Sequence, residues 1–80
     1  MAKFTYITSI RNEKTREIFS EGDLVRRCVD KEGKYIPHTL PNQERFVIIG
    51  LSNLDYVAFV RSLRNPKKES VIYLKELTIN

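Results

Sequence analysis

Two side chains of this 80-residue chain have the chemistry for nucleophilic catalysis, the thiol of Cys28 and the imidazole of His38. A Cys attacks an electrophile when a neighbouring base such as His takes its proton, and a fold could bring these two together. However, His38 lies between Pro37 and Pro41 without an Asp, Glu or Ser placed as its partner, and Cys28 has apolar neighbours. A free Cys in apolar surroundings commonly packs in a core. The sequence therefore assigns no catalytic residue and favours a protein that is not an enzyme.

Few groups in the chain could hold a metal ion or a cofactor. One Cys, one His and scattered carboxylates form no ligand cluster at a recognisable spacing. The three Gly are isolated from one another and make no phosphate-binding loop or dinucleotide fingerprint. We therefore expect no metal and no cofactor, and the single Cys also excludes an internal disulfide.

Aromatic and basic residues are interleaved through the second half of the chain, and this is its most informative chemical pattern. On a small β-barrel, aromatic side chains of one sheet face stack on bases while Arg and Lys side chains hold phosphates. The alternative is that the tyrosines border the core and keep their hydroxyls in solvent. Under the first interpretation the residues expected to contact nucleic acid are Arg26, Arg27, Tyr56, Arg61, Arg64, Lys67, Lys68 and Tyr73.

The formal net charge of +4 is concentrated in the second half of the chain. Residues 1–44 carry 8 basic and 7 acidic side chains, a net of +1, whereas residues 45–80 carry 6 and 3, a net of +3. The excess lies around the 61–68 segment. Such a cluster suits the phosphates of nucleic acid or an acidic partner, and the alternative is a solvated basic loop.

Length and composition indicate one small globular domain. With 41% hydrophobic and 30% charged residues, the chain is neither a disordered tail nor a membrane segment. Its N-terminus lacks the apolar stretch of a signal peptide, and no run approaches the ~18 apolar residues of a membrane span. The sequence therefore predicts a cytoplasmic protein without a membrane partner.

Short strands separated by turns are expected along the whole chain, at intervals near ten residues. In the last long strand, Tyr56 and Arg61 are expected on opposite faces, with Phe59 on the face of Arg61, because side chains alternate. A bulge is expected near Arg26 and Arg27, where apolar residues come in pairs. The segments rich in β-branched, aromatic and apolar residues are 4–10, 23–30, 45–50, 55–63 and 70–74, and a helical turn is expected within 75–79.

Two stretches between these segments predict turns or loops. Gly33 is expected to adopt a positive φ in a hairpin turn over residues 31–34. Two prolines in the 37–41 stretch exclude a central strand there and predict the longest irregular loop. The pattern predicts an all-β barrel or sandwich, most economically a five- to six-stranded, strongly bent barrel. The core expected inside it is Ile7, Leu24, Val25, Cys28, Phe46, Ile48, Val57, Phe59, Ile72 and Leu74.

The run Phe19-Ser-Glu-Gly-Asp-Leu-Val25 resembles the start of the first barrel strand in SH3-like small barrels. The later order of a loop, the apolar strands 45–49 and 56–60, a short turn and the 71–74 strand is similar to that superfold. The resemblance implies a single domain of residues 1–80, with 1–18 as an N-terminal strand and turn and 19–80 as the barrel. KOW and Tudor modules and toxins of the PemK and MazF kind share this superfold, which by itself implies no function.

The toxin version of the superfold implies a ribonuclease site with an Arg on a strand beside a loop hydroxyl. Arg26 or Arg27, Thr39 and Arg61 could take those parts. The chain is short for that family, and it has Arg45-Phe46 where the family has a characteristic Arg-Pro. A toxin-type ribonuclease is therefore the last of three functional hypotheses.

The first hypothesis is a small, non-catalytic binding module that contacts nucleic acid through a basic face. The second is a protein-interaction, regulatory or inhibitor protein of a bacterial or phage mobile element. It is motivated by the high apolar content of the 45–63 segment. An exposed strand edge or apolar patch would then recruit a protein partner or a second copy of the chain.

Overall fold

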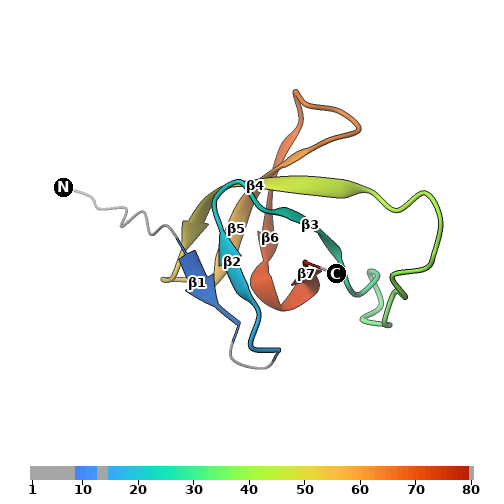
Figure 1. The fold of residues 1–80 in the computed structure, drawn as a ribbon, viewed down its shortest axis with the longest axis horizontal. Coiled ribbons are helices and arrows are strands. Elements are labelled where there is room, and N and C mark those ends of the chain that lie inside the picture. Colours follow the sequence, from blue (N-terminus) through green and yellow to red (C-terminus); the bar gives the residue numbers. More distant parts are fainter. Residues whose placement is uncertain (1–8, 13–14, 80) are drawn as a thin grey trace.

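Strands make up almost all of the regular structure in the computed structural model, which describes residues 9–12 and 15–79 (Figure 1). A two-stranded antiparallel hairpin, β1-β2, packs beside a five-stranded antiparallel sheet in the order β6-β5-β4-β3-β7. The expectation of an all-β protein is confirmed. The elements are β1 (Ser9–Arg11), β2 (Ile18–Ser20), β3 (Leu24–Arg27), β4 (Arg45–Ser52), β5 (Val57–Ser62), β6 (Glu69–Tyr73), the 3-10 turn η1 (Leu74–Glu76) and β7 (Leu77–Thr78).

The long strand β4 organises the sheet, because it pairs with β3 on one side and with β5 on the other. Its side chains alternate between buried and half-buried, so one face meets the core and the other is only partly covered. Between Ile48 and Gly50 the register with β5 shifts, which marks a β-bulge. The expectation of a bulge near Arg26 and Arg27 is wrong, since β3 pairs with β4 in unbroken register.

The connections follow the turn residues of the sequence. Gly22 and Gly33 have φ angles of 93° and 83°, a left-handed region in which glycine avoids the strain of a side chain. The bridge between Val29 and Tyr35 closes the hairpin around Gly33, as expected. The helical turn is confirmed as η1, which begins one residue before the expected segment and leads into β7.

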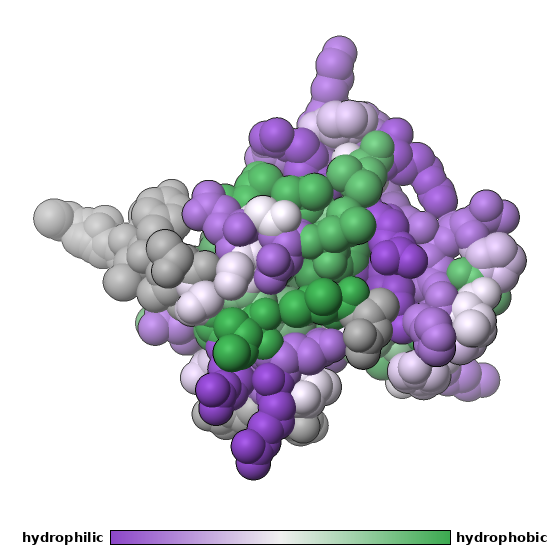
Figure 2. Space-filling view, in the orientation of Figure 1, coloured by the Kyte–Doolittle hydropathy of each residue, from purple (hydrophilic) through white to green (hydrophobic). Residues whose placement is uncertain are grey.

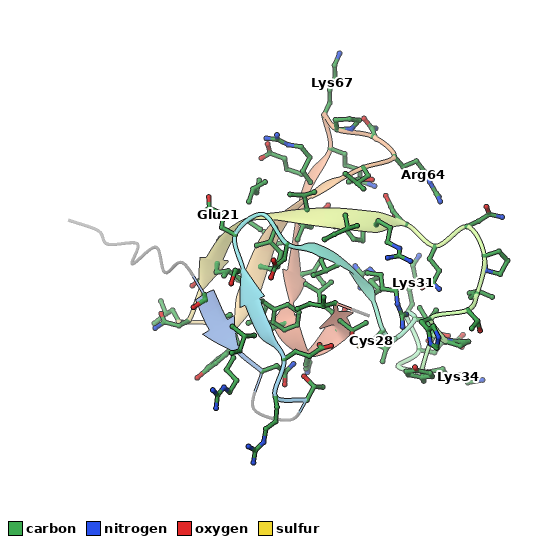
Figure 3. All side chains as sticks on the ribbon, in the orientation of Figure 1. Glu21, Cys28, Lys31, Lys34, Arg64 and Lys67 are labelled. Carbon is green, nitrogen blue, oxygen red and sulfur yellow. The ribbon has the colours of Figure 1, made fainter. Side chains whose placement is uncertain are left out.

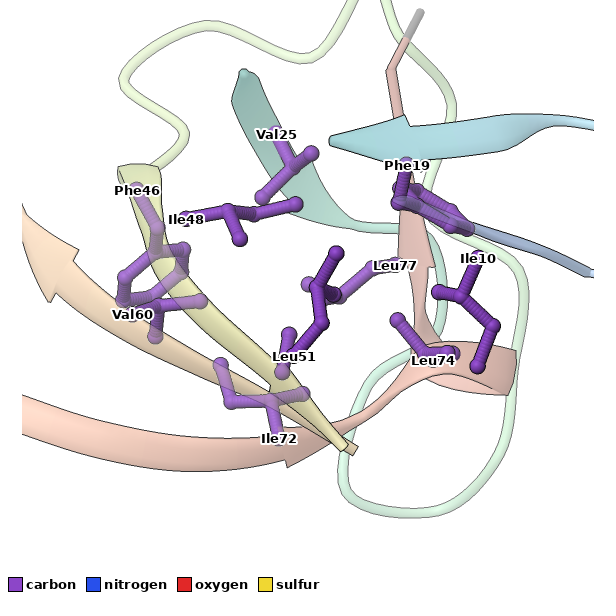
Figure 4. Packing of buried hydrophobic residues seen from close by; sticks show 11 residues of the cluster. Ile10, Phe19, Val25, Phe46, Ile48, Leu51, Val60, Ile72, Leu74 and Leu77 are labelled. Atoms are coloured by element: carbon purple, nitrogen blue, oxygen red, sulfur yellow. The ribbon is translucent and has the colours of Figure 1, made fainter. Parts of the chain in front are cut away.

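The hydrophobic core lies between the large sheet and the β1-β2 hairpin (Figure 4). Ile10 and Phe19 come from the hairpin, which therefore contributes to the same core as the sheet. The whole cluster is Ile10, Phe19, Val25, Phe46, Ile48, Leu51, Ala58, Val60, Ile72, Leu74 and Leu77.

Several residues expected in the core lie elsewhere. Leu24 is 44% exposed, and Cys28 and Phe59 are only half-buried. Leu24 and Phe59 alternate with Val25 and with Ala58 and Val60, which point into the core, and Cys28 follows the last residue of β3. Val57 is buried but lies outside the cluster, and Ile7 lies outside the described residues. No helix within residues 9–12 and 15–79 is long and apolar enough to cross a membrane.

Candidate nucleic-acid interface

Strands β5 and β6 present an exposed face on the side of the sheet away from the core. Residues directly opposite each other in an antiparallel pair share a face, and Phe59 lies opposite Val71 while Arg61 lies opposite Glu69. Tyr73 belongs to the same alternating set of β6, and it is 53% exposed. Val57 lies opposite Tyr73 on this side but is buried, so we give the name outer face to Phe59, Arg61, Glu69, Val71 and Tyr73.

Phe59 lies over the glycine of the neighbouring strand. A Cβ atom built on Gly50 would come within 3.4 Å of the Cδ2 atom of the Phe59 ring. The ring thus lies against the backbone of β4, where no side chain stands beneath it, and the residue as a whole is half-buried. This places a flat aromatic surface in the middle of the outer face.

Positive charge gathers at one end of these strands. Arg61 on the outer face forms an ion pair with Glu69 at 2.9 Å, and both side chains remain about half exposed. Arg64 extends toward the irregular loop and donates a hydrogen bond of 2.9 Å to the backbone carbonyl of Asn42. The turn between β5 and β6 projects from the body, and Lys67 points away from it into solvent (Figure 3). We call Arg64, Lys67 and Lys68, all exposed, the hairpin tip.

Aromatic residues gather at the opposite end. The ammonium group of Lys75 lies 5.6 Å from the centroid of the Tyr73 ring, within range of a cation–π interaction. Tyr56 is 51% exposed and stands in the turn before β5 with a φ of 53°. The backbone carbonyl of Tyr56 accepts a hydrogen bond of 2.9 Å from the amide of Leu74, which ties this turn to η1. The outer face therefore runs from a cationic end to an aromatic end.

The charge of the whole chain is concentrated in this region. Residues 56–75 hold five basic side chains and one acidic one, a net charge of +4, and the flanking Asp55 and Glu76 lower the net charge of residues 55–76 to +2. Residues 1–54 and 77–80 carry the other +2 of the chain, spread over more than twice as many residues. Electrostatic attraction of a polyanion would thus act mainly on β5, β6 and their connections.

The structure separates Arg26 and Arg27 from the outer face. Arg26 is 1% exposed, and its Nη1 atom donates hydrogen bonds to Arg27 O, Ile36 O and Gln43 Oε1 at 2.9–3.1 Å. The expectation that it offers charge at the surface is therefore wrong, because the 28–44 loop covers it. Arg27 is exposed and pairs with Glu76 at 2.7 Å beside η1.

Sequence reasoning missed two members of this region. Phe59 was expected in the core, although its shared face with the charged Arg61 already indicated the outer side. Lys75 was not among the expected binding residues because it follows the last apolar strand, and its approach to Tyr73 appears only in the folded chain. For Phe59, the charge of Arg61 on the same face was the signal in the sequence that this face points to solvent.

Cys28 and His38 both line one surface groove of about 710 Å³. Burial raises the pKa of the Cys28 thiol, so the thiol is protonated at neutral pH. The thiol donates a hydrogen bond of 3.6 Å to the backbone carbonyl of Lys75. A protonated, hydrogen-bonded thiol is a weak nucleophile.

No group of three or more His, Cys, Asp or Glu residues suited to a metal ion occurs in the described part of the chain. No protein-family model, curated protein or solved structure matches this chain. The functional assignment therefore depends on the geometry of the outer face and the hairpin tip.

Proposed function

We propose that the chain is a small, non-catalytic binding module that contacts nucleic acid through the outer face and the hairpin tip. The observation that carries the proposal is the register of β5 and β6, which aligns Phe59, Val71 and Tyr73 on the face of Arg61. The cationic hairpin tip follows directly after the Arg61 end of the outer face. Aromatic platforms flanked by cations are a common arrangement for binding unpaired bases and their phosphates.

The preferred ligand is single-stranded nucleic acid rather than a duplex. Exposed aromatic rings stack on bases only where the bases are unpaired and can turn toward the protein. The cations of the hairpin tip would hold the phosphates that follow the stacked bases. Of the residues predicted from sequence, Arg61 and Tyr73 belong to the outer face and Arg64, Lys67 and Lys68 to the hairpin tip, while Tyr56 stands exposed in the turn beside the aromatic end.

We further propose an SH3-like small barrel as the architecture, in a cytoplasmic protein. The order β6-β5-β4-β3-β7 supports it, because the two edge strands follow each other in sequence. The 3-10 turn η1 joins them, and in the proposed barrel it would bring the two edges near each other while β6 keeps an unpaired edge. Side-chain contacts between β6 and β7 in a solution NMR structure, without backbone hydrogen bonds between these strands, would support a partly open barrel, and the absence of such contacts would favour an open sheet.

The test of binding is fluorescence anisotropy with labelled single strands and a duplex of matched length. We expect the wild type to bind the single strand more tightly, and the double variant K67A/K68A to weaken that binding about 10-fold at ~0.1 M salt. The control is K31A/K34A, which removes the same charge from exposed positions of the 28–44 loop (Figure 3).

The control should bind nearly as well as the wild type. Equal losses in the two double variants would show that only total charge matters, and no binding at low salt would end the proposal. A stronger affinity for the duplex would contradict the stacking of unpaired bases on the outer face.

A protein partner is the second candidate function, because apolar side chains are exposed on other strands as well. Ile18 on β2 is 49% exposed and Leu24 on β3 is 44% exposed. Figure 2 shows apolar surface over β2 and β4 between hydrophilic projections. An apolar surface of this kind suits a protein-interaction, regulatory or inhibitor role. Affinity capture that depends on Leu24 but not on Lys67 would favour this function.

A further inference from the structure

The two edges of the large sheet differ in how well they are protected. The edge strand β7 has two residues, and both are buried, with Leu77 at 0% and Thr78 at 9% exposure. The other edge strand, β6, has five residues. Among the described residues it pairs with β5 on one side and with no strand on the other. Unpaired strand edges expose backbone donors and acceptors that readily pair with another strand.

Strand β6 carries few of the features that keep an edge from pairing. It has no Pro, no Lys and no bulge, and its only charged residue, Glu69, stands at its first position. Val71 at its centre is 58% exposed and Tyr73 at its end is 53% exposed. The sequence of β6 is therefore suited to forming a strand pair.

We propose that two copies of the chain pair antiparallel through β6, about a two-fold axis at Val71. Opposite residues in an antiparallel pair share a face, so the outward set of one copy must meet the outward set of the other. Centring on Val71 satisfies this rule and gives every residue of β6 a partner position, with Glu69 opposite Tyr73. The pairing is isologous, as expected for a symmetric dimer.

The charges of β6 favour this direction and register. Glu69 marks one end of the strand, while the ammonium of Lys75 lies over the Tyr73 ring at the other end. Antiparallel pairing brings each Glu69 to the Tyr73 and Lys75 end of the second copy. Parallel pairing would instead set Glu69 against Glu69, and like charges directly opposite destabilise a strand pair.

Pairing in this way joins the two sheets into one and places the two Val71 side chains together at the axis. The outer faces remain open, so the dimer does not depend on the proposed binding of nucleic acid. An interface made mainly of one strand pair is small, and small interfaces give weak association. We therefore expect a monomer–dimer equilibrium that depends on concentration.

Sedimentation velocity over a range of protein concentrations tests the dimer without any ligand. We expect the wild type to shift from monomer to dimer, and Val71→Lys to weaken the dimer roughly 10-fold because it sets two ammonium groups at the axis. The control Leu54→Lys adds the same charge at an 85% exposed turn position away from β6 and should dimerise as the wild type does.

A charge-swap mixture tests the register. In this dimer, Glu69→Lys and Lys75→Glu each create two like-charged contacts and should dimerise weakly when alone. Mixing the two variants restores both opposite-charge contacts and should restore the dimer. A wild type that stays monomeric at every concentration would overturn the proposal. A dimer unaffected by Val71→Lys, or a mixture no stronger than the separate variants, would also overturn it.

Discussion

Arg26 uses its charge inside the fold, where it fastens the irregular loop to β3. Its guanidinium donates to the carbonyl of Ile36 and to the side-chain oxygen of Gln43. The side-chain Nε2 of Gln43 in turn donates hydrogen bonds to the backbone carbonyls of Pro37 and Leu40 at 2.9 and 2.8 Å. Arg26 and Gln43 therefore replace strand pairing as the source of order in a segment whose prolines cannot join the sheet.

This role predicts different effects for two adjacent arginines. Arg26→Met keeps an apolar stem but leaves buried acceptors unpaired, so we expect the free energy of unfolding to fall by about 2 kcal/mol. Arg27→Met breaks an exposed ion pair and should cost less than about 1 kcal/mol. Urea denaturation followed by circular dichroism measures both. Equal costs would contradict the loop-fastening role of Arg26.

Residue types alone could not assign these roles. The sequence placed Arg26 and Arg27 together as surface cations, yet the loop that covers Arg26 is brought there by contacts across 10 and 17 residues. Phe59 is a different case, because its shared face with Arg61 was visible in the strand period. Phe59 shares its face with the charged Arg61, and a charged residue on a strand indicates the face that points to solvent.

At the level of elements, long apolar runs predicted strands well and short elements poorly. The runs that became β4, β5 and β6 were expected nearly within their observed bounds. The strands β2 and β7 have only three and two residues. Pairing with β1 and β3, respectively, stabilises them, and the short sequences alone do not predict it. The bulge was expected near Arg26 and Arg27 because apolar residues come in pairs on either side of them. The observed bulge lies on β4 instead.

The position of Tyr73 on β6 gives a test of the outer face at this scale. Tyr73→Ala removes an aromatic platform, and stacking of one base is worth about 1–3 kcal/mol, so single-strand affinity should fall at least about 5-fold. Tyr35→Ala removes a 68% exposed tyrosine from the 28–44 loop and serves as the matched control. Anisotropy titrations measure both variants, and equal losses would remove the outer face from the binding surface.

At the scale of the whole molecule, the strand order depends on long-range pairing, whereas the distribution of charge follows from the sequence itself. Composition indicated an all-β chain with excess charge in its second half, and both are properties of local sequence. The pairing of β3 with β7, which lie about fifty residues apart, and the packing of the β1-β2 hairpin on the core had no local signal. Folding then places the excess charge of the 61–68 segment on the hairpin between β5 and β6.

The salt dependence of single-strand binding tests the proposed interface most directly. Each phosphate contact contributes about −0.7 to the slope of log affinity against log salt, so the four cations from Arg61 to Lys68 predict a slope near −3. K67A/K68A should make the slope shallower by about 1.4, while K31A/K34A should leave it unchanged. A slope near zero for the wild type, or the same change in both double variants, would contradict binding through the hairpin tip.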